Sequence, residues 1–233
     1  MKVYYDLHIH TVLSSCGDVL QTPNNILNMC MLKGLNMIAI CDHNTGKQYQ
    51  TIDKIKDSYD FLVIYGIEIT THEGFHLLAY FEKYEELMKL DKIIDDSLDK
   101  SILPPDDQII TDEYDLELEK IPYFLNQKIP LSFNELIKII RELNGIIIPA
   151  HVNKKKSGIL DYYSDFSSYD IDAIEIYDGT DVNELFKEYP YLKKYKYFIN
   201  SDAHDIDIIH EMDHYIELDD LSFASFKKYI LGK

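Results

Sequence analysis

Residues 4–18 read YYDLHIHTVLSSCGD, and this stretch decides the fold because an apolar strand runs directly into a polar turn. His8 and His10 stand two positions apart at the end of that strand. Side chains two residues apart on a strand share one face, so both imidazoles are expected to point the same way. Asp18 stands in the turn that follows. The pattern predicts a polar site where the chain leaves its first strand.

Short strand-like runs alternate with helix signals along the rest of the chain. Thr22 and Pro23 are typical of a helix start, and that helix should end near Gly34. Ser132 and Glu135 have the spacing of a capping box at the start of another helix. Repeated strand–helix alternation predicts a mostly parallel sheet, open or closed into a barrel. The expected strands cover residues 3–9, 36–41, 61–68, 75–81, 145–150, 172–177, 197–201 and 214–218.

The stretch 82–130 breaks this alternation. Residues 91–120 carry eleven acids and three lysines, and the pair Pro104-Pro105 interrupts them. Charge runs are usually solvated, but long insertions in compact domains are often functional. We therefore expect a single domain over residues 1–233, with an acidic insertion after the third or fourth strand. The insertion is either a solvated excursion or a lid over the site, and residues 108–120 could form a hairpin within it.

Composition limits the class of protein. The net charge of −18 argues against a nonspecific nucleic-acid binder, although bound divalent metals would reverse the field locally and leave a nuclease open. The three cysteines are an odd number without framework spacing, which indicates reduced thiols. No apolar run approaches the length of a membrane span, and residues 1–8 show no signal-peptide pattern. The expected location is the cytoplasm.

Histidines and carboxylates recur near the ends of the expected strands. All of them except His76 lie at or just past the carboxyl end of an apolar run. In an α/β barrel these ends meet on one face, where the site is built. Imidazole and carboxylate together suit zinc, manganese or iron, and nine ligands are enough for two to three ions. The predicted metal ligands are His8, His10, Asp18, His43, Glu68, His76, His151, Asp202 and His204.

Five motifs occur in order: DLHIHTVLSSCGD, GLNMIAICDHNT, GIEIT followed by FHLLAYF, IIIPAHV and NSDAHD. Together they resemble the signature of the polymerase and histidinol phosphatase (PHP) family of metal-dependent phosphoesterases, in its small stand-alone form. The resemblance implies a distorted (βα)7 TIM-like barrel with a trinuclear metal site. In some relatives a histidine replaces the residue at the position of Asp18. The implied ligand sets are His8, His10, Glu68 and Asp202; Glu68, His76 and His151; and Asp18, His43 and His204.

The expected reaction is hydrolysis of a phosphate ester by a metal-activated water. Because the metal-activated water is the nucleophile, no protein nucleophile is needed. The sequence accordingly contains neither a G-x-S-x-G elbow nor a P-loop. A small phosphomonoester or a nucleotide is the preferred substrate. The catalytic candidates are Glu68, His151, Asp202 and His204, and the sequence does not say which group protonates the leaving alkoxide.

Two residues are predicted to contact substrate. Lys154 follows His151 closely and either holds the substrate phosphate or is a solvated loop lysine. His72 is expected at the rim of the site. Asp42 is either a turn residue or an acceptor that orients a metal ligand. The remaining histidines, His210 and His214, are interpreted as surface or structural.

Several other functions stay open from the sequence alone. One is an exonuclease or RNA-trimming enzyme, although such a strand-binding groove would favour basic residues among aromatics. A phosphoprotein phosphatase is another. A metal-dependent amidohydrolase also uses an H-x-H on its first strand, but no strand-end lysine is evident here. A non-catalytic metal-binding regulatory domain would be favoured only if ligand positions were empty.

Overall fold

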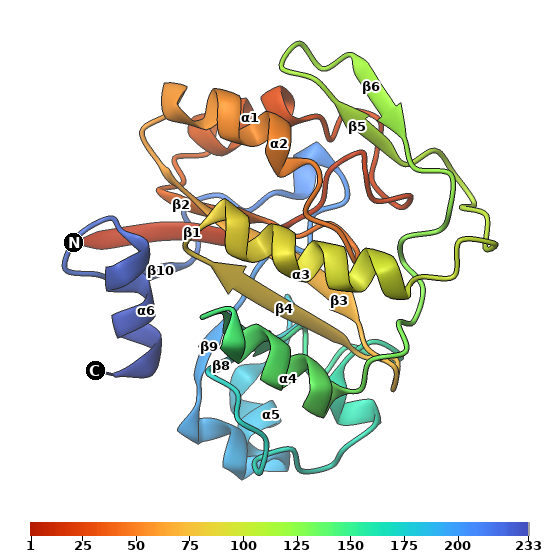
Figure 1. Cartoon of the computed structure of the whole chain (residues 1–233). Coiled ribbons are helices and arrows are strands. Elements are labelled where there is room, and N and C mark those ends of the chain that lie inside the picture. Colours follow the sequence, from red (N-terminus) through yellow and green to blue (C-terminus); the bar gives the residue numbers. More distant parts are fainter. Residues whose placement is uncertain (233) are drawn as a thin grey trace.

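The computed structural model describes residues 1–232, and its core is a six-stranded sheet with the order β10-β1-β2-β3-β4-β7. Helices surround the outside of this curled sheet, and α6 lies beside the N-terminus (Figure 1). All eight expected strands are present, with ends that differ by a few residues. The strands are β1 (Lys2–Ile9), β2 (Met37–Ile40), β3 (Leu62–Thr70), β4 (His76–Phe81), β5 (Ile109–Thr111), β6 (Glu117–Lys120), β7 (Ile146–Pro149), β8 (Ala173–Glu175), β9 (Lys196–Phe198) and β10 (Tyr215–Glu217).

The prediction of a mostly parallel sheet was wrong. β1 pairs parallel to β2, and β2 parallel to β3, but β4 runs antiparallel to both β3 and β7. β10 is also antiparallel to β1. Residues 71–75 join β3 to β4 without a helix, and such a short connection can only reverse the chain. The sheet is therefore mixed, and seven βα units are not confirmed.

Further chain segments extend the curled sheet after β7 and beside the end of β1. β8 and β9 form a separate parallel pair. The Val152 amide donates to the Glu175 carbonyl over 2.8 Å and joins β8 to the chain after β7. Beyond the part of β1 that pairs with β10, the His10 amide donates to the Ala203 carbonyl over 2.9 Å, which brings the chain after β9 to the end of β1. The ends of β1, β2, β3, β7 and β9 consequently face a common region.

The helices begin largely as their sequences predict. Pro23 opens the first helix, although the Thr22 side chain makes no capping hydrogen bond. The capping box is formed, because Ser132 and Glu135 satisfy each other's backbone amides. The α-helices are α1 (Pro23–Leu32), α2 (Tyr49–Ile55), α3 (Tyr84–Ser97), α4 (Phe133–Glu142), α5 (Val182–Glu188) and α6 (Phe223–Leu231). Short 3-10 turns cover Lys56–Ser58, Ile159–Asp161, Pro190–Lys194 and Ile206–Ile208.

The segment 82–130 is partly built into the fold. Helix α3 buries Leu87, Leu90 and Ile94 in the main core. The first part of the segment 82–130 therefore belongs to the layer of helices that covers the sheet. The expected hairpin is present as β5 and β6, which pair antiparallel. The acidic insertion as a whole is not confirmed, and its role as a lid stays a prediction.

Apolar side chains pack on both faces of the sheet. On β2, Ile38 and Ile40 belong to one buried cluster, whereas Met37 and Ala39 belong to the other. Alternate residues of a strand point to opposite faces, so this strand is covered on both sides. Within residues 1–232, no helix combines the length and the apolar character needed to cross a membrane.

Candidate metal centre

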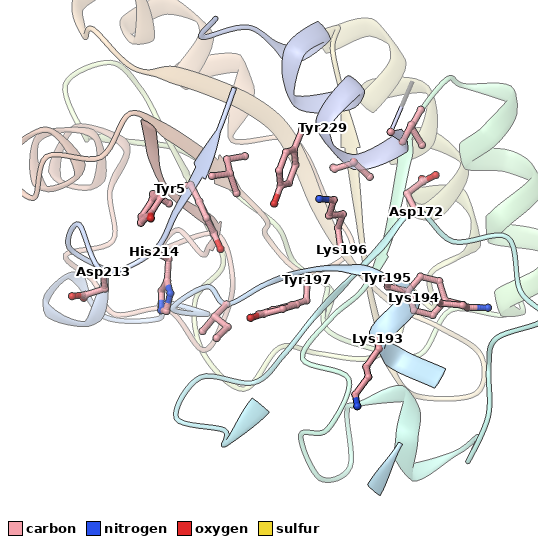
Figure 2. Close-up of a pocket in the computed structure, with 16 residues that line it drawn as sticks. Tyr5, Asp172, Lys193, Lys194, Tyr195, Lys196, Tyr197, Asp213, His214 and Tyr229 are labelled. Atoms are coloured by element: carbon pink, nitrogen blue, oxygen red, sulfur yellow. The ribbon is translucent and has the colours of Figure 1, made fainter. Parts of the chain in front are cut away.

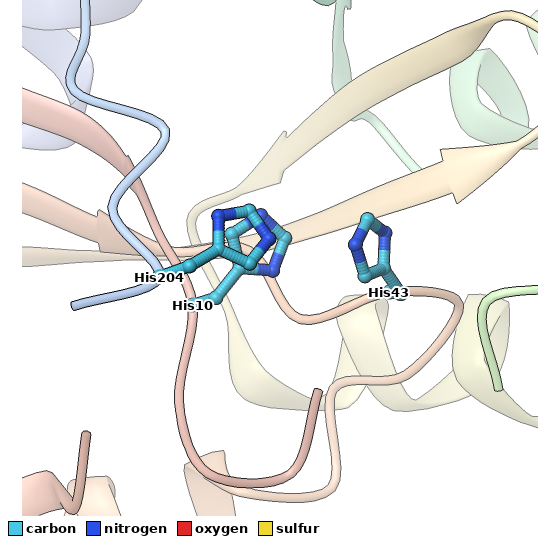
Figure 3. A group of neighbouring side chains, drawn as sticks. All are labelled: His10, His43 and His204. Carbon is cyan, nitrogen blue, oxygen red and sulfur yellow. The ribbon is translucent and has the colours of Figure 1, made fainter. Parts of the chain in front are cut away.

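The ends of the strands bring the predicted histidines together. His8 and His10 are fully buried at the end of β1. A backbone bridge between Ile9 and Ala203 carries His204 to His10, and their ring centroids are 4.0 Å apart. Figure 3 shows the rings of His10 and His204 close together, with His43 beside them. Convergence of these side chains is therefore observed, while their role as ligands stays a prediction.

Glu68 lies at the middle of the cluster and is fully buried. Its Oε1 is 2.8 Å from His76 Nδ1 and 3.1 Å from His151 Nε2. Its Oε2 is 2.8 Å from His43 Nδ1. A carboxylate whose two oxygens face different imidazoles is suited to bridging two ions, which is the role that the sequence motifs imply for it.

Donor atoms of His8, His10 and Glu68 lie within 4.8 Å of one another, and a carboxylate oxygen of Asp202 lies close to both histidines. His8 Nε2 and His10 Nε2 are 3.1 Å apart. Asp202 Oδ1 is 3.5 Å from the first and 3.3 Å from the second, and Glu68 Oε1 is 3.4 Å from His8 Nε2. Tetrahedral zinc ligands at about 2.0–2.1 Å from the ion stand about 3.3 Å from one another. These residues match the first ligand set implied by the sequence.

Buried polar atoms without hydrogen bonds support the same interpretation. His43 Nδ1, Glu68 Oε2 and His151 Nδ1 are all buried and lack a hydrogen-bond partner. His43 Nδ1 and Glu68 Oε2 are only 2.8 Å apart, but their geometry is not that of a hydrogen bond. Buried polar groups in folded proteins are usually satisfied. A shared cation would satisfy this pair, so the donor set fits a divalent metal.

The electrostatics hold the carboxylates ionised. Burial opposes the charge on Glu68, but the imidazoles of His76, His8 and His43 outweigh burial and hold its pKa well below the usual range. For Asp202, burial is likewise outweighed by His8 and a hydrogen bond from His10, so its pKa is also well below the usual range. Burial and the neighbouring His204 and His43 lower the pKa of His10 well below that of a free histidine. His8 differs, because its burial is outweighed by Glu175, Glu68 and Asp202, which raise its pKa well above that of a free histidine. Metal binds ionised carboxylates and neutral imidazoles, so an ion at His8 would displace a proton.

Three residues around the centre have a strained backbone. Asn44, His151 and Asp202 have φ angles of 53°, 27° and 52°, in a region that residues other than glycine rarely occupy. Strain of this kind persists where surrounding contacts impose it, and it is concentrated at functional sites. His151 and Asp202 are themselves predicted ligands, and Asn44 follows another.

A second carboxylate, Glu175, was missed in the sequence. It is buried on β8 and contacts His8 Nδ1 at 3.1 Å from each carboxylate oxygen. It also accepts hydrogen bonds from the His151 amide at 2.7 Å and from Asn200 Nδ2 at 2.7 Å. Such acceptors orient metal-binding imidazoles. An acid inside the apolar run AIEI was the signal that could have revealed it.

Asp42 orients His10 through an intermediate residue. Its carboxylate accepts 2.7 Å hydrogen bonds from the Thr11 amide and from Ser14 Oγ. Ser14 Oγ in turn lies 3.1 Å from His10 Nδ1. The predicted acceptor role is therefore supported by geometry, but it acts on His10 rather than on the adjacent His43.

Three predicted site residues lie at the edge of the cluster. The exposed Asp18 accepts a 2.8 Å hydrogen bond from the Leu20 amide, while its own amide donates to the His204 carbonyl. Lys154 Nζ lies 2.6 Å from Asp202 Oδ2, with about a third of its side chain exposed. His72 is exposed in the turn between β3 and β4. The metal-binding role of Asp18 and the substrate roles of Lys154 and His72 stay predictions.

Known proteins share this fold. No protein-family model matches the chain. An uncharacterised protein from Methanocaldococcus jannaschii is 27% identical over 205 residues, which cover 79% of this chain and 92% of that protein. The lesion-specific endonuclease PfuEndoQ from Pyrococcus furiosus is 20% identical, with a TM-score of 0.74 over 100% of this chain. This chain covers 56% of the endonuclease chain, which is less than two thirds of its length.

A second solved structure agrees with the first. A two-domain protein from Bacteroides vulgatus, which contains a predicted PHP-like metal-dependent phosphoesterase, is 15% identical with a TM-score of 0.55. It aligns with 99% of this chain, which covers 63% of that protein. Similarity at this level of identity establishes the fold. The resemblance in the sequence motifs is thereby confirmed, and the chain has the fold of the PHP-like metal-dependent phosphoesterases.

Proposed function

We propose that the protein is a metal-dependent phosphoesterase, a hydrolase that cleaves a phosphate ester with an activated water at a multinuclear centre. The observation that carries this proposal is the close approach of donor atoms from His8, His10 and Glu68, while the Glu68 carboxylate also faces three further imidazoles. Two to three ions of zinc, manganese or iron suit a donor set of imidazole and carboxylate. When bound, such ions lower the pKa of a water molecule and offset charge on the phosphoryl oxygens.

The chain's own residues would position the reaction. Glu175 holds the ring of His8, and Ser14 holds that of His10, which fixes the direction of their free nitrogens. The ring of His204, with 28% of its side chain exposed, is held by its Nδ1, which lies 2.8 Å from the Asp202 carbonyl oxygen and leaves Nε2 free to bind an ion. Lys154 places a positive charge beside Asp202, where a substrate phosphate would approach the centre.

The segment 82–130 borders the proposed site. Asn44, which follows His43, donates from its side chain to the carbonyls of Leu125 and Gln127 at 2.6 and 2.8 Å. The Ile129 amide donates to the Thr70 carbonyl over 3.0 Å, two residues beyond Glu68. We propose that this segment forms one wall of the substrate site and acts as its lid.

Two substrate classes are compatible with this centre. The net charge of −18 favours a small phosphomonoester or a nucleotide, because a long polyanion would be repelled. A nuclease is the second candidate, since the fold of a lesion-specific endonuclease matches the whole chain. Bound divalent ions would provide the local positive field that nucleic acid requires.

The test is hydrolysis of p-nitrophenyl phosphate and of its bis-ester by the protein loaded with zinc, manganese or iron. We expect metal-dependent hydrolysis that His10→Ala abolishes. Faster turnover of the monoester would indicate a phosphatase, and faster turnover of the diester a nuclease. If the loaded protein retained its metal but cleaved neither ester nor a nucleic-acid substrate, the proposed function would be wrong.

Lys154 allows a more specific test, with its exposed neighbour Lys155 as the matched control. We expect Lys154→Ala to raise KM for phosphate esters by about tenfold, because a charge-assisted hydrogen bond contributes about 1.5–3 kcal/mol. Lys155→Ala should leave KM unchanged. Metal content, measured by elemental analysis, should stay the same in both variants. Unchanged kinetics in Lys154→Ala would show that this residue is a solvated loop lysine that does not bind the substrate phosphate.

A further inference from the structure

A second group of metal-binding side chains lies outside the candidate centre. One nitrogen of His210, one nitrogen of His214 and one carboxylate oxygen of Asp178 lie within 4.8 Å of one another. Asp178 follows β8, whereas the two histidines stand four residues apart just before β10. The cluster therefore joins two stretches that are distant in the sequence. None of the three residues belongs to the PHP-type motifs.

The distances within the cluster suit an ion better than a hydrogen bond. His210 Nε2 is 3.4 Å from Asp178 Oδ2, which is long for a hydrogen bond between an imidazole and a carboxylate. It is close to the separation of about 3.3 Å between two ligands of a tetrahedral zinc ion. The rings of His210 and His214 have centroids 5.2 Å apart, so a small rotation would bring their nitrogens onto the same ion.

His210 is not satisfied by protein contacts alone. Only 10% of its side chain is exposed, and its Nδ1 is buried without a hydrogen-bond partner among residues 1–232. Its other ring nitrogen has only the long contact to Asp178. A buried imidazole with two poorly satisfied nitrogens is unusual, and an ion at Nε2 would satisfy the one that faces the cluster.

The two histidines are held in place by their backbone. The His210 amide donates to Asp6 Oδ2 over 3.0 Å, and the His214 carbonyl accepts from the Tyr5 amide at 3.3 Å. Asp6 is fully buried, and it also accepts from the Ser201 amide at 3.2 Å. A rigid backbone on the histidine side lowers the ordering cost of binding an ion.

Solvent reaches the cluster at His214 and at Asp178. His214 lines a cleft of about 820 Å³ between β9, β10 and α6. Figure 2 shows His214 at one side of this cleft, near Asp213 and Tyr5. The carboxylate side is open as well, because about half of the Asp178 side chain is exposed. An ion therefore has a route to the three side chains.

We propose that Asp178, His210 and His214 form a separate binding site for one zinc ion or a similar transition metal. Two imidazoles and one carboxylate are typical zinc donors, and water would complete the coordination. The ion would join the loop after β8 to the segment before β10, and so brace the chain between Ser201 and β10. The site is independent of the proposed phosphoesterase activity.

The test is anomalous diffraction at the zinc absorption edge, on crystals of the full chain grown with a small molar excess of zinc. We expect a peak between the three side chains, in addition to those at the candidate centre. The peak should be absent from His214→Asn, while peaks at the candidate centre remain. Absence of the peak in the unsubstituted protein would overturn the proposal, whether or not the candidate centre holds zinc.

Solution measurements provide a check that does not depend on the crystal. By elemental analysis, His214→Asn should retain one zinc ion per chain fewer than the unsubstituted protein. The control is His72→Asn, which removes an exposed histidine outside both clusters and should leave the zinc content unchanged. Equal zinc content in all three proteins would contradict the site, provided that circular dichroism shows each to be folded.

Discussion

Glu175 shows how one buried acid can control the proposed chemistry without touching substrate. It binds the ring of His8 and the backbone amide of His151, two of the residues predicted to hold different ions. Replacing it with glutamine keeps the size of the side chain but removes its charge. The imidazole of His8 then keeps at most a neutral amide oxygen in place of the charged acceptor that fixes its orientation and raises its basicity.

We expect Glu175→Gln to weaken metal affinity by about 10–100-fold, which is the usual effect of removing such an acceptor. Competition with a coloured chelator would measure the affinity, and circular dichroism would confirm that the protein is folded. Glu188→Gln, an exposed change on α5, is the matched control. Identical affinities for the two variants would show that Glu175 does not orient a ligand.

The sequence predicts which side chains converge better than it predicts the side chains that support them. His8 and His10 stand out because their spacing on a strand and their position at its end are both local features. Glu175, which accepts from Asn200, reaches His8 only when β8 comes close to β1, and its one local signal is an acid within an apolar run, which does not name the partner. Asp18 is the opposite case. Its motif predicts a metal ligand, but in the structure its carboxylate accepts a hydrogen bond from the Leu20 amide in its own turn.

At the scale of elements, β3 depends on a glycine. A Cβ atom at Gly66 would lie 2.7 Å from Cys41 Sγ and 2.8 Å from the Ile40 carbonyl oxygen. The second contact is with backbone, so the strand itself would have to move. We expect Gly66→Ala to lower the free energy of unfolding by about 1–3 kcal/mol, the usual cost of overpacking. Urea denaturation would measure it, and an unchanged midpoint would contradict this packing.

Helix α3 is tied to its surroundings by Asp95. The carboxylate contacts Lys47 Nζ at 3.0 Å and Lys100 Nζ at 2.8 Å, and the Tyr123 hydroxyl also donates to it. Burial opposes ionisation here, but hydrogen bonds from Lys100, Tyr123 and Lys47 prevail and lower the pKa of Asp95 to about 2. The ionised form is therefore favoured in the folded protein relative to an unfolded chain.

We expect Asp95→Asn to reduce the free energy of unfolding by about 1 kcal/mol at neutral pH, a modest value because the site is partly exposed. A depressed pKa stabilises the fold above the unfolded value of about 3.9. The difference between the two proteins should therefore disappear as the pH falls from about 4 to about 2. Asp96→Asn, next to it on the exposed face, should have little effect. A difference that persisted at the lowest pH would contradict this account.

Strand positions were predictable, whereas strand directions were not. The apolar runs around β3 and β4 are visible in the sequence, and so is the short polar turn between them. Repeated strand–helix alternation predicts a mostly parallel sheet, but residues 71–75 are too few to form a helix between β3 and β4. Pairing of β7 with β4 depends on contacts across 65 positions or more, and no local pattern encodes such contacts.

For the whole molecule, removing the metals should destabilise the fold. Without the metals, the six imidazoles and two carboxylates of the candidate centre would lose the positive ions between them. This centre lies where the ends of five strands face one another. An ion present at a hundred times its Kd stabilises the folded state by about 2.7 kcal/mol. We expect chelation to lower Tm and zinc or manganese to restore it, as measured by differential scanning calorimetry. An unchanged Tm after complete removal of metal would contradict the centre's structural role.

The most direct test of the central claim is elemental analysis of the protein after reconstitution with zinc, manganese or iron. The measurement is best made on His214→Asn, so that only the candidate centre is counted. The predicted result is about two to three ions per chain, as a multinuclear phosphoesterase requires, and fewer in the same protein carrying His10→Ala. Less than one ion per chain with every metal would mean that these residues do not form a metal centre.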